Sequence, residues 1–188
     1  MIPEIGHFAL ILALCVALTQ GTLPLLGAHR LRGDWIALAR PAALAQTLLL
    51  LVAFACLTQA FVDNDFSVIY VAQHSNTLLP TAYRAAAVWG GHEGSLLLWV
   101  TMLGLWTLAV ARLSQPLPER MVARVLGVLG LVSAGLLLFI LLTSNPFERL
   151  LPGAEQGRDL NPLLQDPGLI FHPPMLYMGY VGFAVAFA

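Results

Sequence analysis

The sequence predicts an all-α fold: a polytopic integral membrane helix bundle of about five transmembrane helices, with ordered periplasmic loops and an interfacial helix. The chain of 188 residues is 59% apolar, and its mean hydropathy is +0.81. Only 10% of the residues are charged, against about 25% in a typical soluble domain. This composition excludes ordinary globular, disordered and nucleic-acid-binding proteins. The charges also divide the chain into runs that match the roughly 20 residues a helix needs to cross the hydrocarbon core.

Each expected span is an uncharged run between flanking charges or histidines. The runs comprise 21, 22, 18, 23 and 22 residues. In chain order they lie within 7–29, 40–63, 93–112, 124–148 and 167–188. The first run is not a cleavable signal peptide, because its leading segment carries Glu4 and no basic residue. We expect a single transmembrane domain over 1–188.

The orientation follows from arginine. All nine basic residues are arginine, so chemistry that depends on a lysine is excluded. Six of them lie in the loops 28–40 and 112–124, and three lie in 63–94 and 144–167. Because cytoplasmic loops collect positive charge, the first two loops are predicted to be cytoplasmic. The amino terminus and the other two loops are then expected to face the outer side of the membrane.

The two outer loops are long, whereas the cytoplasmic connections are short and resemble plain turns. Pro80 is expected to separate an extended or partly helical stretch from an interfacial helix over 81–89. Residues 144–167 contain four prolines and are expected to form a loop. Long loops beside short ones usually carry function, so functional residues are expected on the outer side.

Some residues inside the spans are expected to serve packing. Cys15 and Cys56 are isolated in apolar runs and are interpreted as small hydrophobic residues. Trp99 and Trp106 are seven residues apart and are expected to share one helix face. Small residues in the fourth span are expected to let another helix approach closely: Gly127, Gly130, Ala134 and Gly135.

His172 is the most informative residue, and it lies at the outer end of the fifth span in the segment DPGLIFHPPMLYMGYVG. Proline fits the first turn of a helix, so Pro173 and Pro174 place His172 at or just before a predicted helix start. The positive end of the helix dipole disfavours a protonated imidazole, and the neutral form is the one that binds metals, including heme iron. The alternative is a histidine anchored at the interface by backbone hydrogen bonds, and this segment alone leaves both open.

A second cluster lies just ahead of the third span, in the segment WGGHEGS over 89–95. Ser95 is expected to cap the following helix. Trp89, His92 and Glu93 are candidates for a platform or hydrogen-bonding rim around an aromatic ligand. The alternative is an aromatic belt in which the acid favours the helix dipole.

Other histidines have plainer interpretations. His74 and Asn76 belong to the segment QHSN within an otherwise apolar stretch, where polar side chains seek hydrogen-bond partners. A lone histidine in such a run is more often a structural hydrogen bonder than a ligand. His7 and His29 flank the first span and are expected to be interfacial anchors.

Two segments carry a resemblance to a known family: YVAQHSNTLLPTAYRAAAVWGGHEGSLLLWV and NPLLQDPGLIFHPPMLYMGYVGFA. They resemble the amino-terminal part of the CcmF/NrfE heme lyase family of cytochrome c-type biogenesis proteins. The start, MIPEIGHFALILAL, is similar too, so that the resemblance covers the chain almost end to end. Members of the family are much longer, and we therefore expect the chain to be a fragment or a split gene product.

The resemblance implies a membrane subunit of the bacterial inner-membrane heme lyase that completes c-type cytochromes. It implies a b-type heme in transit, received from a heme chaperone at the periplasmic side. That heme would be presented to the CxxCH thiols of apocytochrome c. Thiol-handling membrane subunits would hold the apocytochrome c. The partners are these proteins and the lipid bilayer, with no nucleic acid.

The resemblance also implies site residues. His172 matches a periplasmic histidine proposed as an axial ligand of the heme iron. From the residues themselves, and not from the resemblance, Trp89, His92, Glu93 and Tyr177 are the candidates for its rim. The other histidine ligands of the family lie beyond the equivalent of Ala188, so the chain alone is not expected to be an active enzyme.

Two other functions remain open from the residues. A scaffold subunit would dock assembly partners through residues 63–94. A transporter or channel fragment would place polar residues at mid-depth in several spans, and the spans offer only scattered Thr, Ser and Gln.

Overall fold

The computed structural model describes residues 1–188, with the exception of the side chain of Leu163. Every regular element in this described part is a helix, apart from one isolated antiparallel bridge between Val68 and Arg149. The all-α class is confirmed. The elements are α1 Ile2–Arg30, α2 Gly33–Ile36, α3 Ala39–Val62, α4 Ile69–His74, α5 Thr81–Ala87, α6 His92–Leu113, α7 Glu119–Thr143, the 3-10 turn Pro162–Leu164, α8 Pro167–Val181 and α9 Phe183–Phe187.

Five helical segments are long and apolar enough to cross a membrane, which confirms the predicted number of spans. The second joins α2 to α3, and the fifth joins α8 to α9. The segments are Ile2–Arg30, Gly33–Val62, His92–Leu113, Glu119–Thr143 and Pro167–Phe187.

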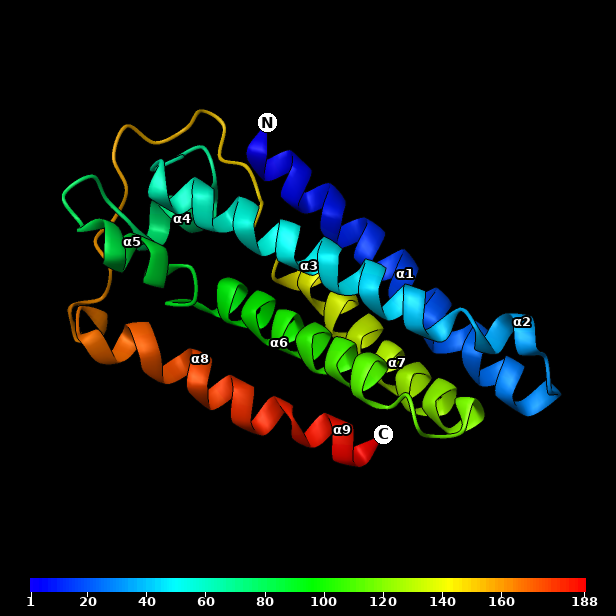
Figure 1. Ribbon diagram of the computed structural model, residues 1–188. Coiled ribbons are helices and arrows are strands. Elements are labelled where there is room, and N and C mark those ends of the chain that lie inside the picture. Colours follow the sequence, from blue (N-terminus) through cyan, green and yellow to red (C-terminus); the bar gives the residue numbers. More distant parts are fainter.

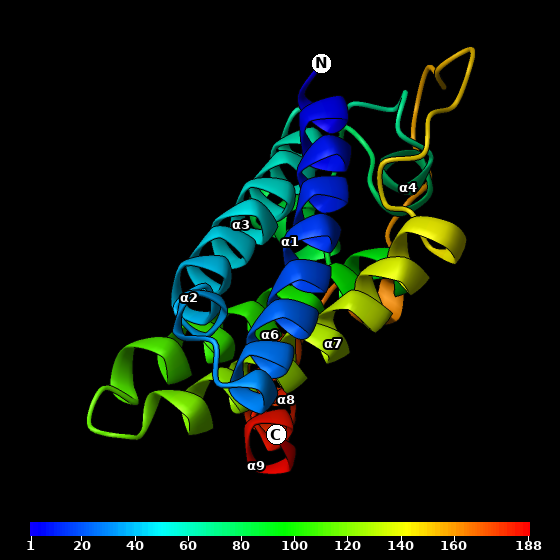
Figure 2. The ribbon, with the colours of Figure 1, turned by 90° about the vertical axis from the view of Figure 1, so that its right-hand side faces the viewer.

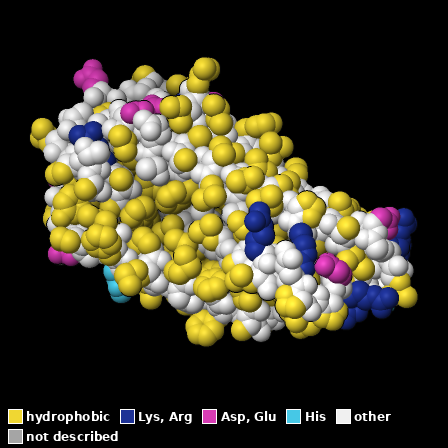
Figure 3. Space-filling view, in the orientation of Figure 1, with side chains coloured by type: hydrophobic (Ala, Val, Ile, Leu, Met, Phe, Trp, Pro, Cys, Tyr) yellow, Lys and Arg dark blue, Asp and Glu magenta, His cyan; other side chains and the backbone are white. Residues whose placement is uncertain are grey.

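The long helices lie side by side, and the short elements gather at the two ends of the bundle (Figures 1 and 2). The end with the amino terminus, α4 and α5 also carries the loop from α7 to α8, and we call it the loop end (Figure 1). The opposite end carries α2 and the turn between α6 and α7, and we call it the arginine end. Basic side chains gather there on the face shown in Figure 3. The structure thus groups the two long loops with the amino terminus, as the charge pattern predicts.

Close contact between α1 and α7 depends on the small residues that the sequence singled out. A Cβ added at Gly130 would lie 2.9 Å from the backbone nitrogen of Gly21. A Cβ added at Gly127 would lie 2.6 Å from Cγ of Leu25. Gly135 differs, because a Cβ there would meet no atom within 4 Å. The interpretation as a helix-packing stripe is therefore confirmed for the first two glycines and is wrong for the third.

Polar side chains inside the spans also join helices. Gln20 is fully buried, and its Nε2 donates to the carbonyl oxygen of Leu126 at 2.7 Å, linking α1 to α7. Thr47 Oγ1 donates to the carbonyl oxygen of Gly104 at 2.9 Å, linking α3 to α6. Hydrogen bonds of this kind hold helices together in an environment without water.

The loop between α7 and α8 is ordered against the region around α4. Three of its backbone N–H groups donate to carbonyl oxygens there: Leu150 to Ser67 at 2.8 Å, Ala154 to Phe66 at 3.3 Å and Arg158 to Ala72 at 2.7 Å. The loop passes over α4 and α5 on its way to α8 (Figure 1). It therefore fixes the position from which α8 begins.

Arg149 joins three segments at this end. Its Nε donates to Oε1 of Glu4 at 2.8 Å, near the start of α1. Its Nη1 lies 3.3 Å from Oδ2 of Asp65 and also donates to Oγ of Ser67, in the turn between α3 and α4. One guanidinium thus links the start of α1, the α3–α4 turn and the loop.

The helix start predicted at His172 is wrong, whereas the uncharged run over 167–188 agrees with the observed span Pro167–Phe187. α8 begins at Pro167, and Asp166 caps it through Oδ1, which accepts from the Gly168 N–H at 2.7 Å. Pro167 at the first helical position with an acid before it is itself a start signal, and it precedes His172 by more than one turn. Pro173 and Pro174 consequently lie inside the helix. The helix-dipole argument for a neutral His172 therefore does not apply.

The predicted cap of the third span is also wrong. α6 begins at His92, and Gly91 holds the extended N-cap position. The Ser95 hydroxyl instead donates to the carbonyl oxygen of Trp89 at 2.9 Å, which closes the turn ahead of the helix. The interfacial helix expected over 81–89 is present as α5, two residues shorter than expected.

Candidate functional site

His172 lies on the open face of α8, near the loop end. Its side chain is exposed, and no hydrogen bond to the imidazole occurs among the described residues. Leu176 and Gly179 follow at spacings of four and three residues, so they share its helix face. Leu176 is 48% exposed, and a Cβ added at Gly179 would meet no atom within 4 Å. The structure presents one imidazole on an uncovered apolar helix face.

Tyr177 lies on the other side of α8, in an aromatic cluster against α6. Its ring stacks on Trp99 with centroids 5.9 Å apart, and Tyr180 meets Trp99 edge to face at 5.2 Å. The two tyrosine rings lie 5.7 Å apart. These contacts attach α8 to α6, and they turn Tyr177 away from the face that carries His172.

Trp89 contacts the beginning of α8. Its indole Nε1 donates to the carbonyl oxygen of Leu169 at 2.8 Å. Its ring is stacked near Phe54 of α3, with centroids 6.2 Å apart and planes 11° from parallel. The sequence singled out Trp89 but not Phe54, because a contact between distant segments has no local signal.

His92 and Glu93 open α6 at the loop end. Nδ1 of His92 lies 3.3 Å from the Ser144 hydroxyl, and its ring meets Phe139 edge to face at 6.2 Å. His92 is therefore directed toward the end of α7. Glu93 is half-buried in the first turn of α6, where a carboxylate favours the helix dipole.

His74 takes part in a compact hydrogen-bonded cluster with Tyr70. Its Nδ1 lies 3.0 Å from the Tyr70 carbonyl oxygen, and the two rings are 4.6 Å apart. The buried Tyr70 hydroxyl donates to the carbonyl oxygen of Val88 at 2.9 Å and accepts from the Gly91 N–H at 3.0 Å. Burial raises the pKa of this hydroxyl, so it stays neutral. Tyr70 was not singled out from the sequence, although an aromatic residue four positions before a histidine on one helix is a usable signal.

Glycine is required where this cluster meets the entry to α6. A Cβ added at Gly91 would lie 2.5 Å from Nε2 of His74, and one added at Gly94 would overlap with the carbonyl oxygen of Val88. Asn76 contributes at the same end, since its Oδ1 accepts from two backbone N–H groups and its Nδ2 donates to Asp159 at 3.0 Å. His74 and Asn76 thus make the contacts of structural hydrogen bonders.

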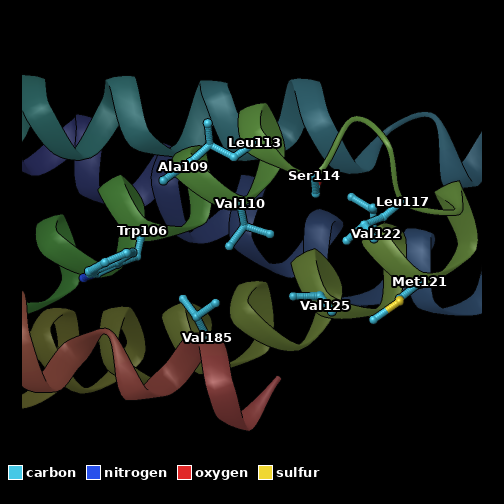
Figure 4. A pocket seen from close by; sticks show the side chains of 10 residues that line it. All are labelled: Trp106, Ala109, Val110, Leu113, Ser114, Leu117, Met121, Val122, Val125 and Val185. Carbon is cyan, nitrogen blue, oxygen red and sulfur yellow. The ribbon is translucent and has the colours of Figure 1, made fainter.

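The candidate residues lie on different sides of their helices: His172 on the open face of α8, Tyr177 against α6 and His92 toward the end of α7. Among the described residues, no group of three or more His, Cys, Asp and Glu side chains is arranged to hold a metal ion. A cavity of about 370 Å³ lies between α6, α7 and α9 instead, with Trp106, Val125 and Val185 in its wall (Figure 4). It extends to the turn between α6 and α7 at the arginine end, and its lining is almost entirely apolar. Such a cavity gives no support to a polar transport vestibule.

Comparison with known proteins identifies the chain's relatives. Residues 89–188 match the family described as Cytochrome C assembly protein. Over its whole length the chain is 64% identical to the cytochrome c-type biogenesis protein CcmF of Pseudomonas aeruginosa and 60% identical to that of Escherichia coli K12. The chain spans 29% of the length of each of these curated relatives.

The fold is similar as well. The chain matches a solved structure titled Cytochrome c Heme Lyase CcmF with a TM-score of 0.84 and 28% sequence identity. The match covers 98% of this chain and 29% of the solved one. The family segment 89–188 is more than half of the 188 residues, and it contains His172 and every candidate for its rim. The chain belongs to the cytochrome c assembly protein family.

Proposed function

We propose that this chain forms the heme-receiving part of a cytochrome c heme lyase and that His172 is an axial ligand of the heme it receives. The observation that carries the proposal is the exposed imidazole on the uncovered apolar face of α8. Its support is the membership of the chain in a family whose relatives in Pseudomonas aeruginosa and Escherichia coli are named for cytochrome c biogenesis. Heme is here a substrate in transit, in the b-type form that precedes covalent attachment.

The residues around His172 suit such a substrate. A neutral imidazole is a standard ligand of heme iron, and the flat apolar macrocycle needs an apolar surface with little relief. Leu176 and Gly179 provide an exposed apolar side chain and an open position on the same face as His172. One imidazole supplies one axial position of the iron. Trp89, His92 and Glu93 remain proposals for contacts at the edge of the substrate, whereas Tyr177 packs against Trp99 on the other side of α8.

The chemistry assigned to the complex is thioether formation on apocytochrome c. Each cysteine S–H of a CxxCH segment adds across one heme vinyl C=C bond, so that a C–S bond forms and the proton ends on the neighbouring carbon. No atom leaves in this addition. His172 would hold the iron, and thereby the vinyl groups, in a fixed position while partner subunits bring the thiols.

The proposal includes an orientation. The loop end faces the periplasm of a bacterial inner membrane, together with the amino terminus, because six of the nine arginines belong to the opposite end. A heme chaperone and subunits that hold apocytochrome c would then approach the loop end. Cysteine labelling at Leu78, which is 88% exposed in the α4–α5 connection, tests the orientation with a membrane-impermeant reagent. Labelling in intact spheroplasts is expected, and labelling only after lysis would contradict it.

The ligand role is tested by His172→Ala in the complete protein, purified from membranes together with its heme. We expect loss of the heme absorption bands and of cytochrome c maturation, with unchanged membrane insertion. The matched control is His7→Ala, because His7 is a partly exposed histidine near the loop end of α1. An unchanged heme spectrum and unchanged maturation in His172→Ala would overturn the proposal.

A further inference from the structure

The two prolines inside α8 disturb its backbone next to His172. A proline has no N–H and cannot donate to the carbonyl oxygen four residues earlier. Pro173 therefore withdraws the helical donor of Leu169, whose carbonyl lies one turn before His172. Helices commonly bend at such positions unless another group takes over the freed carbonyl.

The Leu169 carbonyl has a replacement donor. Trp89 Nε1 donates to it at 2.8 Å. Trp89 is itself held in place. Its ring stacks near Phe54, and its backbone carbonyl oxygen accepts from the Ser95 hydroxyl at 2.9 Å. The donor that proline removes from the helix is thus supplied from a fixed point in the connection between α5 and α6.

α8 has few other polar attachments. Only two residues of α8 are buried, Leu169 and Val181, against nine to eleven in each of α1, α3, α6 and α7. Apart from the hydrogen bonds at its own ends, to Asp166 and Ala188, two hydrogen bonds among the described residues join 167–187 to other segments, and both come from tryptophan. The second is from Trp106 Nε1 to the carbonyl oxygen of Met178 at 3.0 Å. The N–H of Gly182, the C-cap residue of α8, donates to the carbonyl oxygen of Tyr180.

We propose that Trp89 is a positioning residue for His172: its indole N–H replaces the backbone donor that Pro173 lacks and so fixes the turn of α8 from which the imidazole projects. The effect of Trp89 on heme binding rests on the proposed function. Its effect on the position of the His172 imidazole does not. Trp106 makes a hydrogen bond of the same kind almost two turns beyond His172. Trp106 therefore provides a matched control.

The first experiment follows the NMR signal of the His172 imidazole in protein without heme. The protein is labelled with ¹³C at histidine Cε1 and studied in detergent micelles, where His172→Ala assigns one of the five histidine signals. Trp89→Phe keeps an aromatic ring beside Phe54 but removes the N–H. We expect it to shift or broaden the His172 signal, while Trp106→Phe leaves that signal in place. An unchanged His172 signal in folded Trp89→Phe, or equal changes in both variants, would overturn the assignment.

A rescue variant separates positioning from a general loss of folding. Pro173→Ala restores a backbone N–H at position 173, which can serve the Leu169 carbonyl within the helix. In the Pro173→Ala background, Trp89→Phe should therefore alter the His172 signal much less than it does in the parent protein. An equal effect in both backgrounds would mean that Trp89 does not act through this carbonyl.

The consequence for heme is measured in the complete protein. Trp89→Phe is expected to change the electron paramagnetic resonance signature of the ferric heme and to weaken heme binding about fivefold, the scale of one hydrogen bond. Trp106→Phe should retain the parent signature. If His172→Ala leaves heme binding unchanged, the proposed function fails, and the imidazole experiment still decides whether Trp89 positions His172.

Discussion

The four helices α1, α3, α6 and α7 are held together by close packing, whereas α8 is attached at a few points. In the bundle, glycines let α1 and α7 approach until added methyl groups would collide. α8 instead contacts the bundle through tryptophan and tyrosine rings and two indole hydrogen bonds. Its opposite face is uncovered and carries His172. The bundle is therefore the rigid support, and α8 is the element that presents the candidate ligand.

This difference separates two kinds of mutational effect. Substitutions in the bundle should damage folding, because nothing in a packed interior can move aside at low cost. Substitutions on the open face of α8 should leave folding intact and act on ligand or partner binding. Matched pairs of variants can test whether the division is real.

The largest effect is expected for Gly130→Leu. A side chain there meets the Gly21 backbone nitrogen, which cannot rotate away, so α1 and α7 must separate. We expect the folded protein to be lost from membranes, as measured by fluorescence-detected size-exclusion chromatography after detergent extraction. Gly135→Leu on the same helix is the control and should be recovered normally, because its side chain would point into open space. Equal recovery of the two variants would contradict the packing difference between these positions.

A second comparison uses the same substitution in the two regions. Leu137 of α7 is fully buried, and Leu137→Ala should cost roughly 2–5 kcal/mol of stability through the cavity it leaves. Leu176 of α8 is 48% exposed, and Leu176→Ala should change stability by less than about 0.5 kcal/mol. Thermal unfolding in one detergent measures both. A similar loss in both variants would show that the open face of α8 is packed in the intact protein.

The sequence predicts the bundle better than it predicts the attachment of α8. Uncharged runs and arginine positions are local signals, and they identified the five spans and the grouping of the two long loops. The start of α8 was misplaced because His172-Pro-Pro and Asp166-Pro167 are both start signals, and only the path of the loop before the helix decides between them. The bond from Trp89 to Leu169 joins residues 80 positions apart, so no local pattern could reveal it.

The cluster at the entry to α6 should give an intermediate effect with a characteristic pH dependence. Tyr70→Phe removes the hydroxyl that hydrogen-bonds to the Val88 carbonyl and to the Gly91 N–H. The free energy of unfolding should therefore fall by roughly 1–3 kcal/mol at neutral pH. Burial raises the pKa of Tyr70 above its ordinary value of about 10. A group with a raised folded pKa contributes stability fully below its unfolded pKa, and that contribution is lost as the pH rises through the folded pKa.

The stability difference between the parent protein and Tyr70→Phe should accordingly be constant near neutral pH and shrink above about pH 10. Chemical unfolding at a series of pH values measures it. Tyr83→Phe is the control, since Tyr83 lies partly exposed in the neighbouring helix α5. A difference that grows at high pH would mean that Tyr70 is ionised in the folded protein.

The smallest of these effects is expected at the loop end, where Arg149 joins α1, the α3–α4 turn and the loop. Its side chain is 28% exposed and its partner Glu4 is 58% exposed, so water and salt weaken the attraction. Arg149→Gln should therefore cost only about 1 kcal/mol, and the cost should fall further in high salt. Thermal unfolding at low and high salt measures this cost, with Arg158→Gln as the control on the same loop.

In Arg149→Gln the loop keeps its backbone hydrogen bonds to Ser67, Phe66 and Ala72, so α8 should stay in place and heme binding should not change. A loss of heme binding in Arg149→Gln would instead mean that the ion pairs of Arg149, and not the backbone bonds of the loop together with the tryptophan contacts, hold α8 in position.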